Sequence, residues 1–67
     1  MKTLKVQFSF IGHSRGEAIF HSRADLDTFI ENNKEEMLRY SVAPCDGNGN
    51  ILAPFVVYHT INEAYYE

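Results

Sequence analysis

Hydrophobic and polar residues alternate along the first ten positions of the chain, MKTLKVQFSF. The apolar positions from residue 4 onward are Leu4, Val6, Phe8 and Phe10. A period of two is typical of a β-strand with one face in the core and one in solvent. A polar turn bracketed by Gly12 and Gly16 follows, and the apolar residues 18–20 then predict a second strand. The two strands form a hairpin whose loop of about five residues is of ordinary length.

A helix is predicted after the hairpin, beginning at Ser22. Asp25 follows three residues later, and this spacing is typical of a helix start. The serine side chain accepts a hydrogen bond from a free backbone N–H, and the acidic residue favours the positive end of the helix. Leu26, Phe29 and Ile30 then form an apolar stripe at helical spacing. We expect this stripe to pack on the sheet.

Two interpretations remain open after Asn33, a polar residue that interrupts the apolar stripe. A long helix would carry Tyr40 on the same face as the stripe. Alternatively, the helix ends near Glu36, and the alternation of Leu38, Tyr40 and Val42 forms a third strand. We favour the shorter helix, because tyrosine and valine favour strands and these two lead directly into a turn.

That turn, CDGNGN at residues 45–50, is the clearest loop signal in the chain, because glycine and asparagine tolerate the positive φ values of tight turns. A fourth strand is predicted from Ile51 to about Ile61. Its middle, FVVYH at residues 55–59, is apolar on both faces, so we expect it to lie centrally in the sheet or under a partner. The sequence therefore predicts a single α+β domain over residues 1–67, with a four-stranded, mainly antiparallel sheet and one helix on a face, in the order ββαββ.

Composition and charge narrow the classes of function. The 67 residues carry a net charge of −3, and the six lysines and arginines are dispersed, so nucleic acid is not an expected partner. The one local charge concentration is acidic, around Glu31 and Glu35, and is typical of a solvated helix face. Cys45 is the only cysteine and cannot form an internal disulfide. No apolar run suggests a signal peptide or a membrane span, so we expect a cytoplasmic protein without a membrane partner.

Two motifs suggest chemistry that the rest of the chain does not support. Residues 12–16, GHSRG, match the G-x-S-x-G elbow of serine hydrolases. That elbow needs a strand, a turn and a helix on a large parallel sheet, whereas this match is followed by a predicted strand, so a hairpin turn is favoured over a small hydrolase. The D-x-N-x-N spacing of residues 46–50 suggests calcium, but Ile51 and Val57 occupy the glycine and glutamate positions of an EF-hand. No catalytic, metal or cofactor site is predicted.

The leading hypothesis is a non-enzymatic protein-binding module whose partner is another protein or a second copy of the chain. The fourth predicted strand has more apolar surface than a sheet with one helix needs. The carboxyl-terminal residues NEAYYE either fold back or meet a partner, and tyrosine is enriched at interfaces. The candidate protein-binding residues are Val56, Tyr58, Tyr65, Tyr66, Glu31 and Glu35.

The alternative hypothesis is a single-stranded nucleic-acid binder that stacks bases on Phe8 and Phe10. It is disfavoured because the helix needs an apolar sheet face and these residues supply it. The short, acidic chain resembles small proteins of phages and mobile elements, which often bind a host protein, although no motif carries that resemblance.

Overall fold

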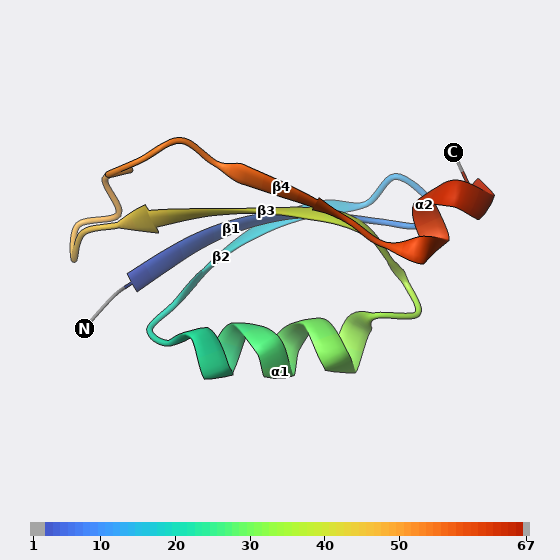
Figure 1. The fold of residues 1–67 in the computed structure, drawn as a ribbon, viewed down its shortest axis with the longest axis horizontal. Helices are drawn as coiled ribbons and strands as arrows, with labels where there is room; N and C mark the ends of the chain where they lie inside the picture. The colour runs from blue at the N-terminus through green and yellow to red at the C-terminus, as the bar shows by residue number, and fades with distance from the viewer. Residues whose placement is uncertain (1–2, 67) are drawn as a thin grey trace.

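The computed structural model describes residues 3–66, which form a four-stranded sheet and two helices (Figure 1). The elements are β1 (Thr3–Phe10), β2 (Arg15–Phe20), α1 (Arg23–Asn33), β3 (Met37–Cys45), β4 (Val56–His59) and α2 (Ile61–Tyr66). All strand pairings are antiparallel. The predicted α+β class and the ββαββ order are confirmed, with a short carboxyl-terminal helix in addition.

The amino-terminal strand β1 lies inside the sheet, whose strand order is β2-β1-β3-β4. Val6 lies opposite Ala18 of β2 and opposite Val42 of β3. Residues that face each other across antiparallel strands point to the same side of the sheet. The apolar positions of β1 therefore share one face with those of its neighbours, and the polar positions share the other, open face.

Helix α1 lies along the apolar face of the sheet (Figure 1). Leu26 and Val6 are fully buried and form a core cluster with Val42. The Phe29 ring contacts the rings of Phe8 and Phe20, with centroid distances of 5.1 and 5.3 Å. The predicted apolar stripe of the helix therefore does pack on the sheet. Its start is also confirmed, because the Asp25 N–H donates to the Ser22 hydroxyl at 3.1 Å.

The shorter of the two predicted helices is correct. Helix α1 ends at Asn33, and Met37 begins β3. The Asn33 side-chain amide donates to the carbonyl of Phe29 at 2.8 Å. The side chain thus turns back on its own helix and bonds to the carbonyl four residues earlier, in the last turn of α1. The polar residue that interrupts the apolar stripe thus has a structural role at the helix end.

The fourth strand differs from the prediction in length and in position. Instead of Ile51 to Ile61 it spans four residues, and Ile51 forms only an isolated bridge with Cys45. The expectation of a central position is wrong, because β4 is an edge strand and all four of its residues are exposed. The physical reason is the pairing of β1 with both β2 and β3, which gives the internal position to the amino-terminal strand. Ile61 begins a helix instead of ending a strand.

The predicted turn at residues 45–50 is organised by one carboxylate. Asp46 Oδ1 accepts hydrogen bonds from the backbone N–H groups of Asn48 at 2.8 Å and Asn50 at 2.9 Å. The Asn50 backbone and side-chain hydrogen bonds, and then that of Asn48, hold the pKa of Asp46 below its usual value. The D-x-N-x-N spacing therefore serves a turn that closes on its own backbone, as the sequence indicated.

Candidate protein-binding surface

The residues of β4 form the largest exposed apolar segment that belongs to a strand. Val56, Val57 and Tyr58 are 54%, 49% and 37% exposed, and His59 is exposed beside them. We call these four residues the β4 surface. One edge of β4 pairs with β3, from Val42–Val56 to Arg39–His59, and within residues 3–66 no strand pairs with its other edge.

The β4 surface has two faces, because neighbouring residues of a strand point to opposite sides. Val56 and Tyr58 share the face of the core residue Val42, whereas Val57 and His59 lie on the open face. The Tyr58 ring stacks on Tyr40 of β3 at a centroid distance of 5.1 Å and an interplanar angle of 16°. This stack holds an aromatic side chain in place at the edge of the sheet. Two of the predicted site residues, Val56 and Tyr58, therefore do lie together.

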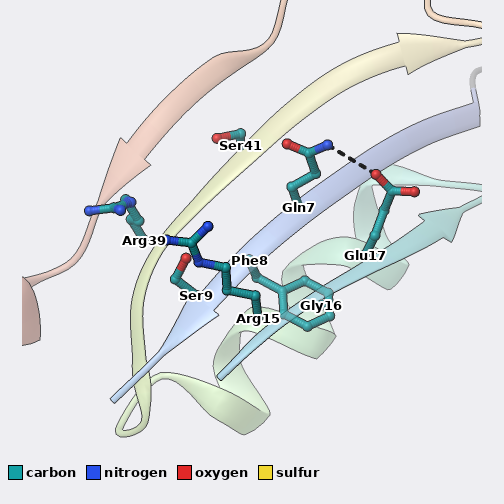
Figure 2. A pocket seen from close by; sticks show the side chains of 8 residues that line it. All are labelled: Gln7, Phe8, Ser9, Arg15, Gly16, Glu17, Arg39 and Ser41. Carbon is teal, nitrogen blue, oxygen red and sulfur yellow. Dashed lines mark hydrogen bonds between the residues drawn. The ribbon is translucent and has the colours of Figure 1, made fainter. Parts of the chain in front are cut away.

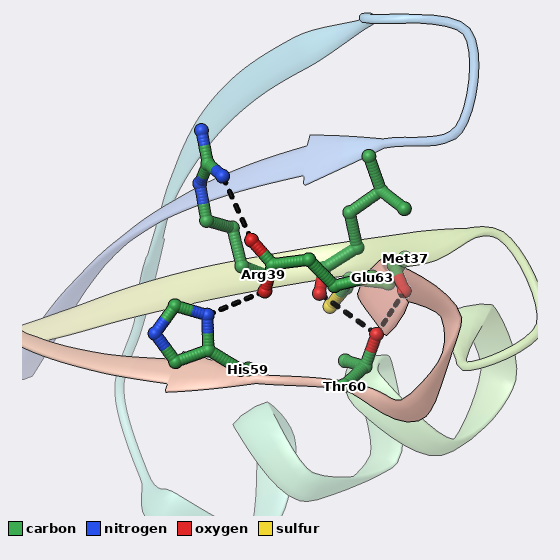
Figure 3. A network of polar contacts seen from close by, with 6 residues as sticks. Met37, Arg39, His59, Thr60 and Glu63 are labelled. Atoms are coloured by element: carbon green, nitrogen blue, oxygen red, sulfur yellow. Dashed lines mark hydrogen bonds and ion pairs between the residues drawn. The ribbon is translucent and has the colours of Figure 1, made fainter. Parts of the chain in front are cut away.

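Helix α2 folds back on the open face through a carboxylate. Glu63 is 7% exposed. Its Oε1 accepts a hydrogen bond from Arg39 Nη1 of β3 at 2.9 Å, and its Oε2 contacts His59 Nδ1 of β4 (Figure 3). The carboxylate thus joins two adjacent strands to the helix that follows them. The sequence analysis missed this network, because Arg39 is distant in the sequence from Glu63 and because His59 and Glu63 lie on different elements.

The connection between β4 and α2 is also fixed by polar contacts. The Thr60 hydroxyl lies 2.6 Å from the Met37 carbonyl and 2.7 Å from the Leu38 carbonyl, both on β3 (Figure 3). Asn62 donates to the carbonyl of Lys34 at 2.7 Å, in the loop after α1. The carboxyl-terminal segment therefore does fold back, and it does so through the polar side chains of Thr60, Asn62 and Glu63, whereas Tyr65 is exposed.

The remaining predicted site residues lie on other elements. Tyr65 of α2 is 78% exposed. Ile61, which lies on the same face of the helix, is 75% exposed. The side chain of Tyr66 lies outside the described part of the structure. Glu31 lies on α1 and Glu35 in the loop that follows, and both are exposed. Glu31 accepts a hydrogen bond from Lys34 at 2.8 Å, and this bond raises the pKa of that lysine above its usual value.

The G-x-S-x-G match forms the hairpin turn between β1 and β2. The Phe10 N–H donates to the Ser14 carbonyl at 2.7 Å, and Gly12 and His13 have φ values of 91° and 69°. The chain enters this turn from one antiparallel strand and leaves it into the next, so the strand–turn–helix geometry of a nucleophile elbow is not formed.

Replacing Ser14 with alanine should change the free energy of unfolding by less than about 0.5 kcal/mol, because the side chain is exposed in a surface turn. Urea denaturation of both proteins would measure the difference. A fluorophosphonate probe should leave the native protein unlabelled, and labelling that disappears in Ser14→Ala would contradict this interpretation.

The aromatic residues invoked for nucleic-acid binding lie on the face that α1 covers. The Phe8 ring contacts Phe10 at a centroid distance of 5.2 Å and Phe29 of α1 at 5.1 Å. A ring packed in this way does not present an open face for a base. The open face of the sheet carries mainly polar side chains instead.

No group of three histidine, cysteine or acidic side chains within residues 3–66 is arranged to hold a metal ion. None of the helices in the same range is long and apolar enough to cross a membrane. No protein-family model matches the chain, and no curated protein or solved structure is significantly similar to it.

Proposed function

We propose that the protein is a non-enzymatic binding module that pairs the free edge of β4 with an extended segment of a partner protein. The observation that carries the proposal is the exposed, apolar edge strand. Edge strands that avoid such pairing are very short or carry lysine, proline or a bulge. β4 has only four residues, but it contains no lysine or proline and pairs with β3 without a register shift. Strand addition would supply main-chain hydrogen bonds to the partner.

The side chains of β4 support selectivity for an alternating apolar segment. An added strand would place its side chains beside Val56 and Tyr58 on one face and beside Val57 on the other. The Tyr40–Tyr58 stack provides a held aromatic anchor of the kind that is enriched at interfaces. The bound segment would be short, because the loop at residues 46–55 and helix α2 flank the four residues of β4.

A lysine at position 57 tests the proposal, because a charge on an edge strand opposes strand addition. Peptides selected from a random display library on the immobilised protein should be apolar at alternate positions. Val57→Lys should weaken their binding at least about tenfold, because the lysine would place a charge beside the apolar side chains of the added strand. A tenfold loss corresponds to about 1.4 kcal/mol of binding free energy. The matched control is Ile19→Lys on β2, the opposite edge strand, where the isoleucine is 46% exposed against 49% for Val57. The control variant should bind normally.

Two outcomes would contradict the proposal. Selected peptides whose affinity is insensitive to Val57→Lys, and which leave the NMR signals of the β4 amides unshifted, would place binding elsewhere. A concentration-dependent dimer in analytical ultracentrifugation that Val57→Lys dissociates would identify a second copy, and not another protein, as the strand that pairs with β4.

A further inference from the structure

The open face of the sheet contains a hollow of about 610 Å³ (Figure 2). Its lining comes from β1, β2 and β3, and it adjoins the β4 surface where Arg39 lies opposite His59. One end carries the carboxylate of Glu17 together with the amide of Gln7. The other end carries Arg15, Ser9 and Arg39 (Figure 2), and we call these three residues the arginine end.

The strand register brings the arginine end together. Ser9 of β1 lies opposite Arg15 of β2 and opposite Arg39 of β3. Because adjacent strands lie about 4.8 Å apart, the two arginine Cα atoms are separated by roughly 10 Å, with Ser9 between them. All three side chains point to the open face; in Figure 2 the Arg15 guanidinium lies next to Ser9, whereas that of Arg39 extends towards β4 and donates to Glu63. Two long cationic side chains are thus placed on either side of a hydroxyl.

The acidic groups near the hollow already have cationic or amide partners. Glu17 accepts a hydrogen bond from Gln7 at 3.0 Å and pairs with Lys5 at 3.6 Å. Glu63 accepts from Arg39, which holds that guanidinium in place and offsets its charge. Arg15 is exposed and forms no ion pair within residues 3–66. The arginine end therefore keeps a positive charge that the described residues do not neutralise.

We propose that the arginine end binds a phosphate group. A guanidinium offers a planar pair of N–H donors that matches two phosphate oxygens, and the Ser9 hydroxyl can donate to a further oxygen. A phosphate group has three terminal oxygens for these donors, whereas a carboxylate has two. The Glu17 carboxylate at the other end of the hollow disfavours extended polyanions. The ligand is therefore a small molecule or a side chain with one phosphate group.

Titration of the ¹⁵N-labelled protein with inorganic phosphate, at constant ionic strength, tests this site. Saturable shifts should appear at the backbone amides of Ser9, Arg15 and Arg39. Arg15→Ala should weaken binding at least about tenfold, because a hydrogen bond between charged groups contributes more than 1.4 kcal/mol. The phosphate affinity of Arg15→Lys should lie between those of the unmodified protein and Arg15→Ala, because lysine keeps the charge and loses the planar pair of donors. Phosphoserine in place of inorganic phosphate distinguishes a phosphorylated side chain from the free anion as the ligand.

The matched control is Arg23→Ala, because Arg23 is an exposed arginine on α1 that pairs with Asp27 at 3.2 Å. This variant should bind phosphate as the unmodified protein does. Equal responses to acetate, or equal losses in Arg15→Ala and Arg23→Ala, would show non-specific attraction and overturn the proposal. Tighter binding of a single-stranded oligonucleotide, with a steep dependence on salt, would overturn it in favour of a nucleic-acid surface.

Discussion

Replacing Leu26 with alanine should lower the free energy of unfolding by about 3 kcal/mol, within the range of roughly 2–5 kcal/mol for large-to-small changes in a core. Leu26 is fully buried between α1 and the sheet and contacts the cluster formed with Val6 and Val42. A chain of 67 residues has a small margin of stability, so the variant should be largely unfolded near physiological temperature. Urea denaturation followed by circular dichroism would measure the change.

The matched control for this substitution is Glu31→Ala on the same helix. Glu31 is exposed, and its ion pair with Lys34 is of the surface type that contributes little. The free energy of unfolding of Glu31→Ala should stay within about 0.5 kcal/mol of that of the unmodified protein. If Leu26→Ala and Glu31→Ala gave the same urea midpoint, the packing of α1 on the sheet would be refuted.

Gly16→Ala should destabilise the protein by about 1–3 kcal/mol, as overpacked positions do. A Cβ atom at this position would lie 2.4 Å from Cε2 and 2.8 Å from Cζ of Phe8. The Phe8 ring cannot easily move away, because it contacts the rings of Phe10 and Phe29. Gly16, the last glycine of the G-x-S-x-G match, thus leaves the space that the Phe8 ring occupies. Thermal and urea unfolding would measure the loss.

Gly47→Ala is the corresponding control for a glycine in open space. No atom lies within 4 Å of a Cβ built at Gly47, and the positive φ values among the glycines belong to Gly12 and Gly49. This variant should unfold at nearly the same urea concentration as the unmodified protein. A Gly16→Ala protein as stable as Gly47→Ala would mean that Phe8 does not pack over β2.

The elements that could be predicted are those that local sequence determines. The alternation along β1 and the Ser22 cap of α1 depend on residues that are close in the sequence, and both appear in the structure. The edge position of β4 depends on which strands pair, and the apolar run at residues 55–59 contains no information about that choice. Helix α2 was missed for a related reason, because Glu63 is stabilised by Arg39, which is distant in the sequence.

The candidate sites also divide into features that nearby residues determine and features that depend on strand pairing. The exposure of Val56 and Tyr58 could be expected, because the predicted strand had more apolar surface than a single helix can cover. The arginine end could not be expected, since the dispersed arginines give no local signal. Arg15 and Arg39 meet at Ser9 only through the register of β1 with its two neighbours.

The one-sided attachment of β4 has a consequence for the motions of the molecule. Its four side chains are all exposed, and a ten-residue loop, residues 46–55, separates it from β3. Little apolar burial therefore opposes local unfolding of β4 together with α2, and such opening leaves Val6, Leu26 and Val42 in contact with one another. On this basis we expect a minor three-stranded form in which β3 becomes the edge. We therefore expect amide protection from hydrogen exchange to rise from β4 towards β1, with the edge strand detaching most readily.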